Sequence, residues 1–244
     1  MIKTAVILAA GLGSRLKDVT KEMPKGFLEI GGCPIIEKSI EKLFEFGIKK
    51  IFIGTGYLSE AYEMLAANHH SRIQCIKNEN FATTGSMYTL FNMRRHIHQD
   101  FLLLESDLIY DKNGLGFLIN DPAKDVILAS GKTNSNDEVF IEADEHNFLA
   151  NMSKNPAELN NIHSELVGIT KISIHTFRLM CEFAEKTFAS TPKLDYEYAL
   201  VNAAATANIF VKRINNFAWC EIDDEHHLER AKRSIYPQIM ESEA

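Results

Sequence analysis

The residues best suited to chemistry stand near the start of the chain, where an apolar segment runs into a glycine-rich turn. Gly11 and Gly13 follow the apolar residues 6–9, and the cations Arg15 and Lys25 come soon after them. A buried strand that leads into such a turn can cradle an anion with its backbone N–H groups, because glycine lets the chain approach a ligand closely. Arg15 and Lys25 add the positive charge that a triphosphate requires. The pattern therefore predicts a nucleotide-phosphate site.

Two better-known phosphate loops do not fit this turn. The dinucleotide fingerprint needs a third glycine where Leu16 stands, and an acidic residue after the second strand, where Gly56 and Tyr57 stand instead. The P-loop needs Gly-Lys followed by Ser or Thr where its glycine-rich turn enters a helix, and the turn at residues 11–16 lacks these residues. The turn therefore belongs to another class of nucleotide site.

Two acidic positions predict a metal site. Asp107 and Asp223 each end an apolar segment. Carboxylates at the ends of two strands can meet around one hard cation, with phosphate oxygens completing its shell, as is usual for Mg²⁺. The period of a strand places Glu221 on the same side as Asp223, so Glu221 is a third candidate ligand. The alternative is that Asp223 or Asp224 only caps the last helix and that Asp107 lies in a turn.

The first 130 residues alternate apolar strand segments with amphipathic helical segments. This order predicts an α/β fold with a Rossmann-like, mostly parallel mixed sheet and helices on both faces. Ligands of such sheets bind outside the carboxyl ends of the strands, which places the glycine turn and Asp107 on one rim. The expected strands are 4–9, 50–55, 73–77, 101–104 and 125–129, and the expected helices are 36–47, 59–67, 86–94 and 114–118.

After about residue 130 the pattern changes to a small β-rich part. An alternating strand at 138–142 and a polar turn predict a hairpin added to the core. No linker or low-complexity segment appears, so we expect a single domain over 1–244, with a nucleotide-binding core at 1–130. Residues 131–244 would hold the acceptor-binding part and the closing metal strand and helix. The further expected elements are a strand at 166–173, helices at 177–186 and 196–206, a strand pair at 209–214 and 218–222, and a helix at 225–235.

Composition excludes several other classes of protein. The chain has 244 residues and a formal net charge of -7, whereas a nucleic-acid partner requires a basic face. No apolar run approaches the ~20 residues of a membrane span. The four cysteines lack Cys-x-x-Cys spacing, which indicates neither a zinc site nor a disulfide framework, so reduced thiols and a cytoplasmic location are expected. A homodimer remains open. The pairs His69-His70 and His226-His227 lie on polar faces expected to be exposed and are assigned no metal.

The opening pattern resembles that of the sugar-phosphate and choline-phosphate nucleotidyltransferases. Their sequence Ala-Ala-Gly-x-Gly-x-Arg-Leu is matched by residues 9–16, their Pro-Lys by residues 24–25, and their Gly-Gly-x-Pro-Ile turn by residues 31–35. Cys33 stands where this family more often has a basic or polar residue, and it is assigned no role. The segments 84–87, 105–107 and 133–138 resemble one branch most closely, the CTP:2-aminoethylphosphonate cytidylyltransferases. The phosphocholine cytidylyltransferases are the nearest neighbour of that branch.

The resemblance implies a fold of the nucleotide-diphospho-sugar transferase type and a cytidylyltransferase that depends on Mg²⁺. Such an enzyme would join CMP from CTP to 2-aminoethylphosphonate in phosphonate biosynthesis and release pyrophosphate. The alternative is a phosphocholine cytidylyltransferase or an enzyme for another small phosphate acceptor. Lys25 and Arg15 would be catalytic, and Asp107, Asp223 and Glu221 would bind the metal. The expected nucleotide-binding residues are Leu8, Ala9, Ala10, Gly11, Gly13, Ser14, Thr84, Gly85, Ser86 and Ser106.

The acceptor half of the chain carries several acidic residues and few clustered aromatic ones. A primary ammonium has three N–H donors and favours carboxylates, whereas a quaternary ammonium is usually held in an aromatic cage. We therefore expect 2-aminoethylphosphonate to be preferred over phosphocholine, with Asp195 or Glu197 holding its ammonium. The candidate acceptor-binding residues are Asp137, Glu138, Asp195, Glu197 and, for the phosphonate end, Lys154.

Two other function classes are disfavoured. A catalytically inactive nucleotide sensor would have no need for both of the carboxylates Asp107 and Asp223 together with Arg15 and Lys25. An oxidoreductase would bind NAD(P)H, and a thermal-shift measurement with that cofactor would test this reading cheaply.

Overall fold

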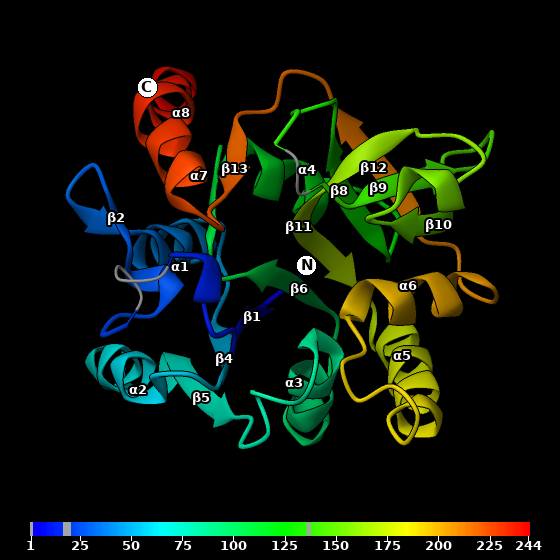
Figure 1. Ribbon diagram of the computed structural model, residues 1–244, viewed down its shortest axis with the longest axis horizontal. Helices are drawn as coiled ribbons and strands as arrows, with labels where there is room; N and C mark the ends of the chain where they lie inside the picture. The colour runs from blue at the N-terminus through cyan, green and yellow to red at the C-terminus, as the bar shows by residue number, and fades with distance from the viewer. Residues whose placement is uncertain (1, 17–20, 136–137) are drawn as a thin grey trace.

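A nine-stranded mixed sheet forms the centre of the molecule (Figure 1). The computed structural model describes residues 2–16, 21–135 and 138–244. The path through the sheet is β10-β9-β11-β6-β1-β4-β5, and β8 joins β11 to β12. The strands of this sheet are β1 (Thr4–Ala9), β4 (Lys50–Thr55), β5 (Ile73–Lys77), β6 (Phe101–Glu105), β8 (Val126–Ser130), β9 (Phe140–Ala143), β10 (Leu149–Ser153), β11 (Ser164–Ile172) and β12 (Phe210–Ile214).

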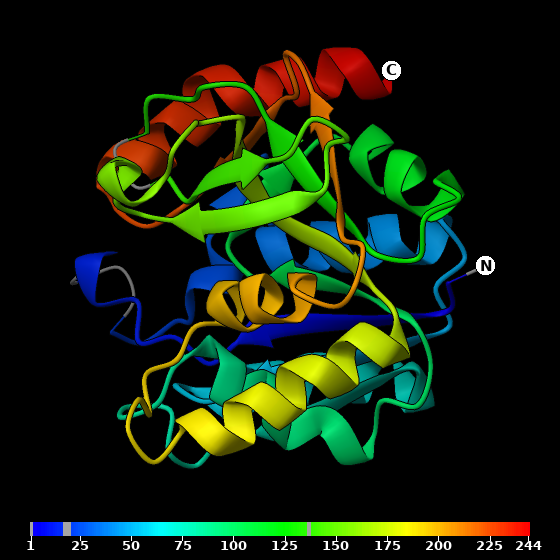
Figure 2. The ribbon, with the colours of Figure 1, turned by 90° about the vertical axis from the view of Figure 1, so that its right-hand side faces the viewer.

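Helices cover both faces of this sheet. One apolar cluster packs α1, α2 and α4 against one face, and a second packs α3, α5 and α6 against the other. Figure 2 shows the sheet between α5 on one side and α7 and α8 on the other. The helices are α1 (Ile35–Glu45), α2 (Ser59–Asn68), α3 (Ser86–Asn92), α4 (Asn113–Asn120), α5 (Ile174–Thr187), α6 (Tyr196–Ala204), α7 (Glu225–Arg230) and α8 (Tyr236–Glu243).

Strand β1 occupies the middle of the sheet because all six of its residues are apolar or small and are buried. It pairs in parallel with β4 on one side and β6 on the other. Its register places Leu8 beside Glu105. The turn after β1 and the residues after β6 therefore emerge side by side at the carboxyl edge of the sheet, as expected from the rule for parallel sheets.

The parallel part predicted from the first half of the chain is present in β5-β4-β1-β6. Strand β11 then lies antiparallel to β6, β8 and β9, which makes the sheet a mixed one. The hairpin of β9 and β10 is also present and adds two antiparallel strands at one edge. The register of β11 against β8 shifts between Leu166 and Thr170, which marks a β-bulge inside β11.

The predicted strand pair at 209–214 and 218–222 does not form. Strand β12 pairs in parallel with β8, whereas β13 (Trp219–Glu221) pairs with the short strand β7 (Leu108–Tyr110), which the sequence did not predict. This pairing sets Glu221 opposite Leu108, and the N–H of Ile222 donates to the carbonyl of Asp107 at 3.0 Å. Two acidic segments far apart in sequence are thereby joined at one point.

The chain ends in a longer helical segment than the one predicted at 225–235. After α7 the backbone forms one π-helical turn (Ala231–Ile235) and continues as α8. Lys42 on α1 forms a 2.7 Å ion pair with Glu243 on α8, which fastens this end of the chain to α1. A further two-stranded pair, β2 (Glu29–Ile30) with β3 (Cys33–Pro34), packs into the same apolar cluster as α8.

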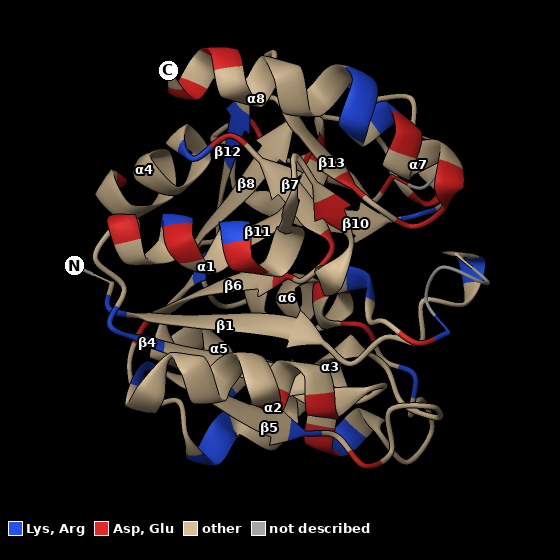
Figure 3. Ribbon diagram, turned by 90° about the vertical axis from the view of Figure 1, so that its left-hand side faces the viewer, with Lys and Arg blue, Asp and Glu red and all other residues tan. Residues whose placement is uncertain are grey.

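The surface carries both charge signs. Along α1, Glu37, Glu41 and Glu45 are interspersed with Lys38 and Lys42, as Figure 3 shows. All four cysteines are free thiols. In the part of the chain that the structure describes, every helix is too short or too polar to span a bilayer.

Candidate active site

A cavity of about 390 Å³ opens at the carboxyl edge of β1 and β6. Seventeen residues proposed from the sequence line it: Leu8, Ala9, Ala10, Gly11, Arg15, Lys25, Thr84, Gly85, Ser86, Ser106, Asp107, Glu138, Lys154, Asp195, Glu197, Glu221 and Asp223. Gly13 and Ser14 are not among the lining residues. Asp137 lies outside the described residues. The cavity thus joins the predicted nucleotide, metal and acceptor residues in one space.

The glycine turn brings its arginine to the cavity. Gly13 has a φ of +62°, a left-handed conformation that residues with a Cβ rarely adopt, and the N–H of Leu16 donates to its carbonyl at 3.1 Å. The following turn directs Arg15 inward, and its guanidinium lies 2.8 Å from Asp223 Oδ1. Gly13 therefore shapes the turn from a buried position, while Ala10 and Gly11 form the wall.

Lys25 lies between the two predicted metal carboxylates. Its Nζ is 3.1 Å from Asp107 Oδ2 and also donates to Asp223 Oδ1. Burial alone would lower the pKa of Lys25, but the charges of Asp107 and Asp223 outweigh burial and raise it above its ordinary value. Lys25 is therefore a permanent cation that holds these two carboxylates together.

A second group of carboxylates lies next to this ion pair. Glu105, Asp107 and Glu221 each place an oxygen within 4.8 Å of the other two. Burial, with the nearby charges of Glu197 and Asp107, raises the pKa of Glu105 to about 8. Burial and the charges of Glu105 and Asp107 raise the pKa of Glu221 well above its ordinary value. These shifts indicate a shortage of positive charge, and hard carboxylate oxygens at this spacing suit a divalent cation.

One side of the cavity, which includes the predicted acceptor residues Asp195 and Glu197, is built where the first turns of α3 and α6 meet. Asp195 Oδ1 accepts hydrogen bonds from the N–H and hydroxyl of Ser86 at 3.4 and 3.3 Å. Ser86 Oγ accepts in turn from the N–H of Tyr196 at 2.9 Å. Ser86 therefore satisfies the start of α6, whereas the N-cap position of its own helix is held by Gly85. One oxygen of Asp195 is consequently engaged by the protein itself.

Glu197 places a carboxyl group on this side with an oxygen that lacks a hydrogen bond in the described part of the chain. Its Oε2 is buried, and the described residues offer this oxygen no hydrogen-bond donor. Burial raises the pKa of Glu197 to about 7, the charge of Asp195 adds to the effect, and the charge of Lys154 opposes it. Lys154 is exposed at the end of β10. Lys154 and Glu197 thus lie close enough to interact, although the sequence assigned them to opposite ends of the acceptor.

Some lining residues were missed from the sequence. Glu105 lies two positions before Asp107 and is the one charged residue of β6, a signal that could have found it. Tyr196 donates its hydroxyl to Glu105 Oε1 at 2.6 Å. Gly168 and Trp219 also line the cavity, but they stand in apolar segments where a core role is the ordinary expectation.

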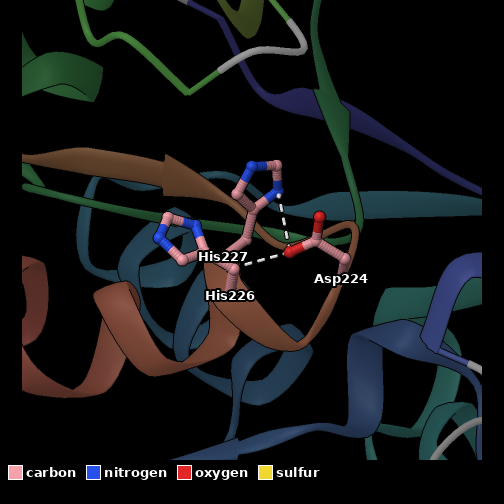
Figure 4. A group of neighbouring side chains, drawn as sticks. All are labelled: Asp224, His226 and His227. Atoms are coloured by element: carbon pink, nitrogen blue, oxygen red, sulfur yellow. Dashed lines mark hydrogen bonds and ion pairs between the residues drawn. The ribbon is translucent and has the colours of Figure 1, made fainter.

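The predicted exposure of the His226-His227 pair is wrong for His227, which is 4% exposed. The N–H of Asp223 donates to His227 Nδ1 at 3.4 Å, so Nε2 carries the proton and donates to the carbonyl of Ser135 at 3.0 Å. Asp224 caps α7 by accepting from the N–H of His227 at 2.8 Å (Figure 4). Asp224 is therefore the helix cap, and Asp223 is left to face the cavity.

The segment that enters the cavity from β8 contains a Gly-Lys-Thr tripeptide at residues 131–133. It lies in an irregular loop and not at the start of a helix, so it is no P-loop. The N–H of Thr133 donates to Glu165 Oε2 at 2.7 Å, and the N–H of Ser135 donates to Glu138 Oε1 at 2.6 Å. These N–H groups therefore hold the loop in its shape, and one oxygen of Glu138 is used as an acceptor.

Comparison with known proteins gives consistent matches. Residues 4–139 match the family model described as nucleotidyl transferase. The choline-phosphate cytidylyltransferase of Haemophilus influenzae is 24% identical over 227 residues, which cover 92% of this chain and 95% of that protein. The CMP-5'-(3-aminopropyl)phosphonate synthase of Streptomyces rubellomurinus is 26% identical over 231 residues, which cover 90% of this chain and 37% of that longer protein.

A likeness to solved structures supports the fold. The inositol-1-phosphate CTP transferase from T. maritima superposes with a TM-score of 0.82 at 18% identity, covering 99% of this chain and 96% of that one. This match confirms the predicted α/β class, with a mixed sheet between helices.

The buried carboxyl group of Glu197 leads to a pH-dependent stability. Its pKa is about 7 in the folded protein and 4.5 in the unfolded chain, so between these values the folded state binds more protons. The contribution of Glu197 to the free energy of unfolding therefore decreases as the pH rises from the lower of these pKa values to the higher. We expect Glu197→Gln to gain stability relative to the wild type between pH 5 and pH 8, measured by urea unfolding. A difference that stays constant with pH would contradict this, and Glu145→Gln, at an exposed turn, serves as the control.

Proposed function

The chain belongs to the nucleotidyl transferase family, and we propose that this enzyme transfers CMP from CTP to 2-aminoethylphosphonate, with release of pyrophosphate, in phosphonate biosynthesis. The observation that carries this proposal is the position of Lys25 between Asp107 and Asp223 at the edge of the glycine turn. Cations for a triphosphate and carboxylates for a metal thus meet in one cavity. The two cytidylyltransferase relatives act on a choline phosphate and an aminopropylphosphonate, by their names.

The proposed reaction needs no protein nucleophile. An oxygen of the phosphonate attacks the α-phosphorus of CTP and forms a new P–O bond. The bond from that phosphorus to the oxygen bridging to the β-phosphorus breaks, and pyrophosphate leaves with the electron pair. Cys220 lines the cavity, but burial raises the pKa of its thiol to about 11, which keeps it protonated and a poor nucleophile.

The chain contributes alignment and charge to this reaction. Arg15 and Lys25 would offset the charge of the triphosphate and of the leaving pyrophosphate. Ala10, Thr84 and Gly85 would lie along the nucleoside. Asp107 and Glu221, which belong to the carboxylate cluster, and Asp223, which pairs with Lys25, would hold Mg²⁺. When bound, the ion would neutralise charge that develops on the transferred phosphoryl group.

The acceptor is inferred from four further acidic side chains that line the cavity, which we call its acidic wall. Glu105, Glu138, Asp195 and Glu197 favour a cation with N–H donors. A quaternary ammonium lacks N–H donors and is usually held by aromatic faces, so it would leave the hydrogen-bonding capacity of these carboxylates unused. A primary ammonium therefore suits the wall better than choline does.

A pyrophosphate-release assay tests the function directly. The four nucleoside triphosphates are crossed with 2-aminoethylphosphonate, phosphocholine and inositol phosphate in the presence of Mg²⁺. We expect the highest kcat/KM with CTP and 2-aminoethylphosphonate, because the acidic wall provides acceptors for all three N–H groups of the ammonium. A higher kcat/KM for phosphocholine would overturn the acceptor, and absence of turnover in every combination would overturn the function.

The neighbouring aspartates after β13 provide a matched pair of variants. Asp223→Asn should lower kcat by at least ~10², because a carboxylate proposed to bind the metal and seen to pair with Lys25 is lost. Asp224→Asn should retain activity, because asparagine caps a helix as well as aspartate does. Chelation of Mg²⁺ should abolish wild-type turnover and its return should restore it. Equal activity of the two variants would remove Asp223 from the site.

Lys25 should act on the transition state and not only on binding. If its charge stabilises the leaving pyrophosphate, Lys25→Ala lowers kcat by roughly 10²–10³, the range for loss of one preorganised donor. Lys49→Ala, at an exposed position away from the cavity, is the control and should be unaffected. A Lys25→Ala enzyme that changes KM alone would show that Lys25 supplies ground-state binding only.

A further inference from the structure

Glu105 belongs to the carboxylate cluster with Asp107 and Glu221, but it is not one of the three proposed metal ligands. It is the last residue of β6 and lies beside Leu8 at the edge of the sheet. Its Oε1 accepts the hydroxyl hydrogen of Tyr196 at 2.6 Å. Among the described residues, no Lys or Arg approaches within ion-pair distance of this carboxylate, whereas Asp107 and Asp223 share Lys25. Glu105 is therefore held in place by the protein but not neutralised by it.

The fold leaves room for this carboxylate by placing a glycine in a left-handed backbone conformation beside it. Gly168, in the bulged part of β11, has a φ of +82°, and a Cβ placed there would lie 2.9 Å from both the carboxyl carbon and Oε2 of Glu105. A side chain at position 168 would thus force Glu105 to move and would strain the backbone as well. The position of Glu105 is consequently defined from two sides, by Gly168 and by Tyr196.

A second carboxyl group beside it lacks a donor. Glu197 follows Tyr196 at the start of α6, and its buried Oε2 has no hydrogen-bond donor among the described residues. Tyr196, the residue next to Glu197, donates its hydroxyl to Glu105, and both carboxylates line the same cavity. Asp195, the other acidic residue of this segment, already accepts from Ser86. A ligand that brings N–H donors and positive charge would satisfy Glu105 and Glu197 together.

The length of the acceptor decides which carboxylate can meet its ammonium. Two carbon atoms separate phosphorus from nitrogen in 2-aminoethylphosphonate, so the nitrogen lies within about 5 Å of the phosphorus, given single bonds near 1.5 Å. The phosphonate must react at the Asp107 end of the cavity. Glu105 has an oxygen within 4.8 Å of one on Asp107, so it lies within reach of an ammonium so near the reacting group.

We infer that Glu105, with Glu197 beside it, binds the ammonium group of the acceptor and makes the enzyme select acceptors that carry one. This inference rests on the proposed function and adds to it a residue that determines specificity. One N–H of the ammonium donates to Glu105 and another to Glu197 Oε2. Tyr196 and Gly168 are positioning residues, which act through Glu105.

The test compares two acceptors that differ only in the amino group, 2-aminoethylphosphonate and ethylphosphonate, with CTP and saturating Mg²⁺. The variant Glu105→Gln keeps the size of the side chain and an oxygen for the Tyr196 hydroxyl, so it should fold as the wild type does. We expect its kcat/KM for 2-aminoethylphosphonate to fall about 10- to 100-fold, the range for losing a charge-assisted hydrogen bond, while that for ethylphosphonate changes less than about threefold. Glu105→Asp, which keeps the charge, should retain part of the preference.

Each other outcome overturns the inference in a recognisable way. An equal loss for both acceptors, together with a higher Mg²⁺ concentration for the half-maximal rate in a separate Mg²⁺ titration, would make Glu105 a metal ligand. An equal loss with a lowered melting temperature would make its role structural. Equal kcat/KM of the wild-type enzyme for both acceptors would show that no side chain of the cavity recognises the ammonium. Absence of turnover with either acceptor would overturn the proposed function, and this assignment with it. Glu145→Gln is the matched control and should behave as the wild type in both assays, since its side chain is 87% exposed.

Discussion

The interaction on which the active site depends is the contact of Lys25 with both Asp107 and Asp223. Glu105, Glu197 and Glu221 line the same cavity. Lys25 and the half-exposed Arg15 neutralise only part of the negative charge of these carboxylates. Burial makes repulsion between such carboxylates strong, because the surroundings screen charge poorly. The free energy of binding available to any cation that enters, whether metal or ammonium, arises from this imbalance. The same imbalance explains why two of these carboxyl groups have pKa values near neutrality.

The rest of the fold serves to bring these charges together from distant parts of the chain. Parallel pairing of β1 with β6 sets the glycine turn beside Glu105 and Asp107. The short pairing of β7 with β13 adds Glu221 and Asp223 to the same point. The hydrogen bonds between Ser86 and the start of α6 bring Tyr196 and Glu197 to the same cavity. The first of these contacts was predicted from the rule for parallel sheets, but the pairing of β7 with β13 and the hydrogen bonds of Ser86 were not.

This difference explains what could be predicted from the sequence and what could not. The bounds of β1, β4 and β5 were predicted to the residue, because each is a short segment rich in apolar residues between polar stretches. Asp107 and Asp223 follow from residue type at the end of apolar segments, and Lys25 from the Pro-Lys pair after the glycine turn. The partner of β13 was missed because β7 has only three residues, and the burial of His227 because it depends on a carbonyl at Ser135. Glu105 was given no role, since nothing local shows that Gly168 leaves space for its carboxylate.

The central claim is that the cavity is an acidic nucleotide site in which a divalent cation must offset the carboxylates before a triphosphate can enter. Isothermal titration of CTP into the protein, once with Mg²⁺ and once with a chelator, measures this without any turnover. The account predicts that binding with Mg²⁺ is at least about tenfold tighter, because without the cation the triphosphate meets Asp107, Asp223 and Glu221 as like charges. Equal affinity under the two conditions would contradict it.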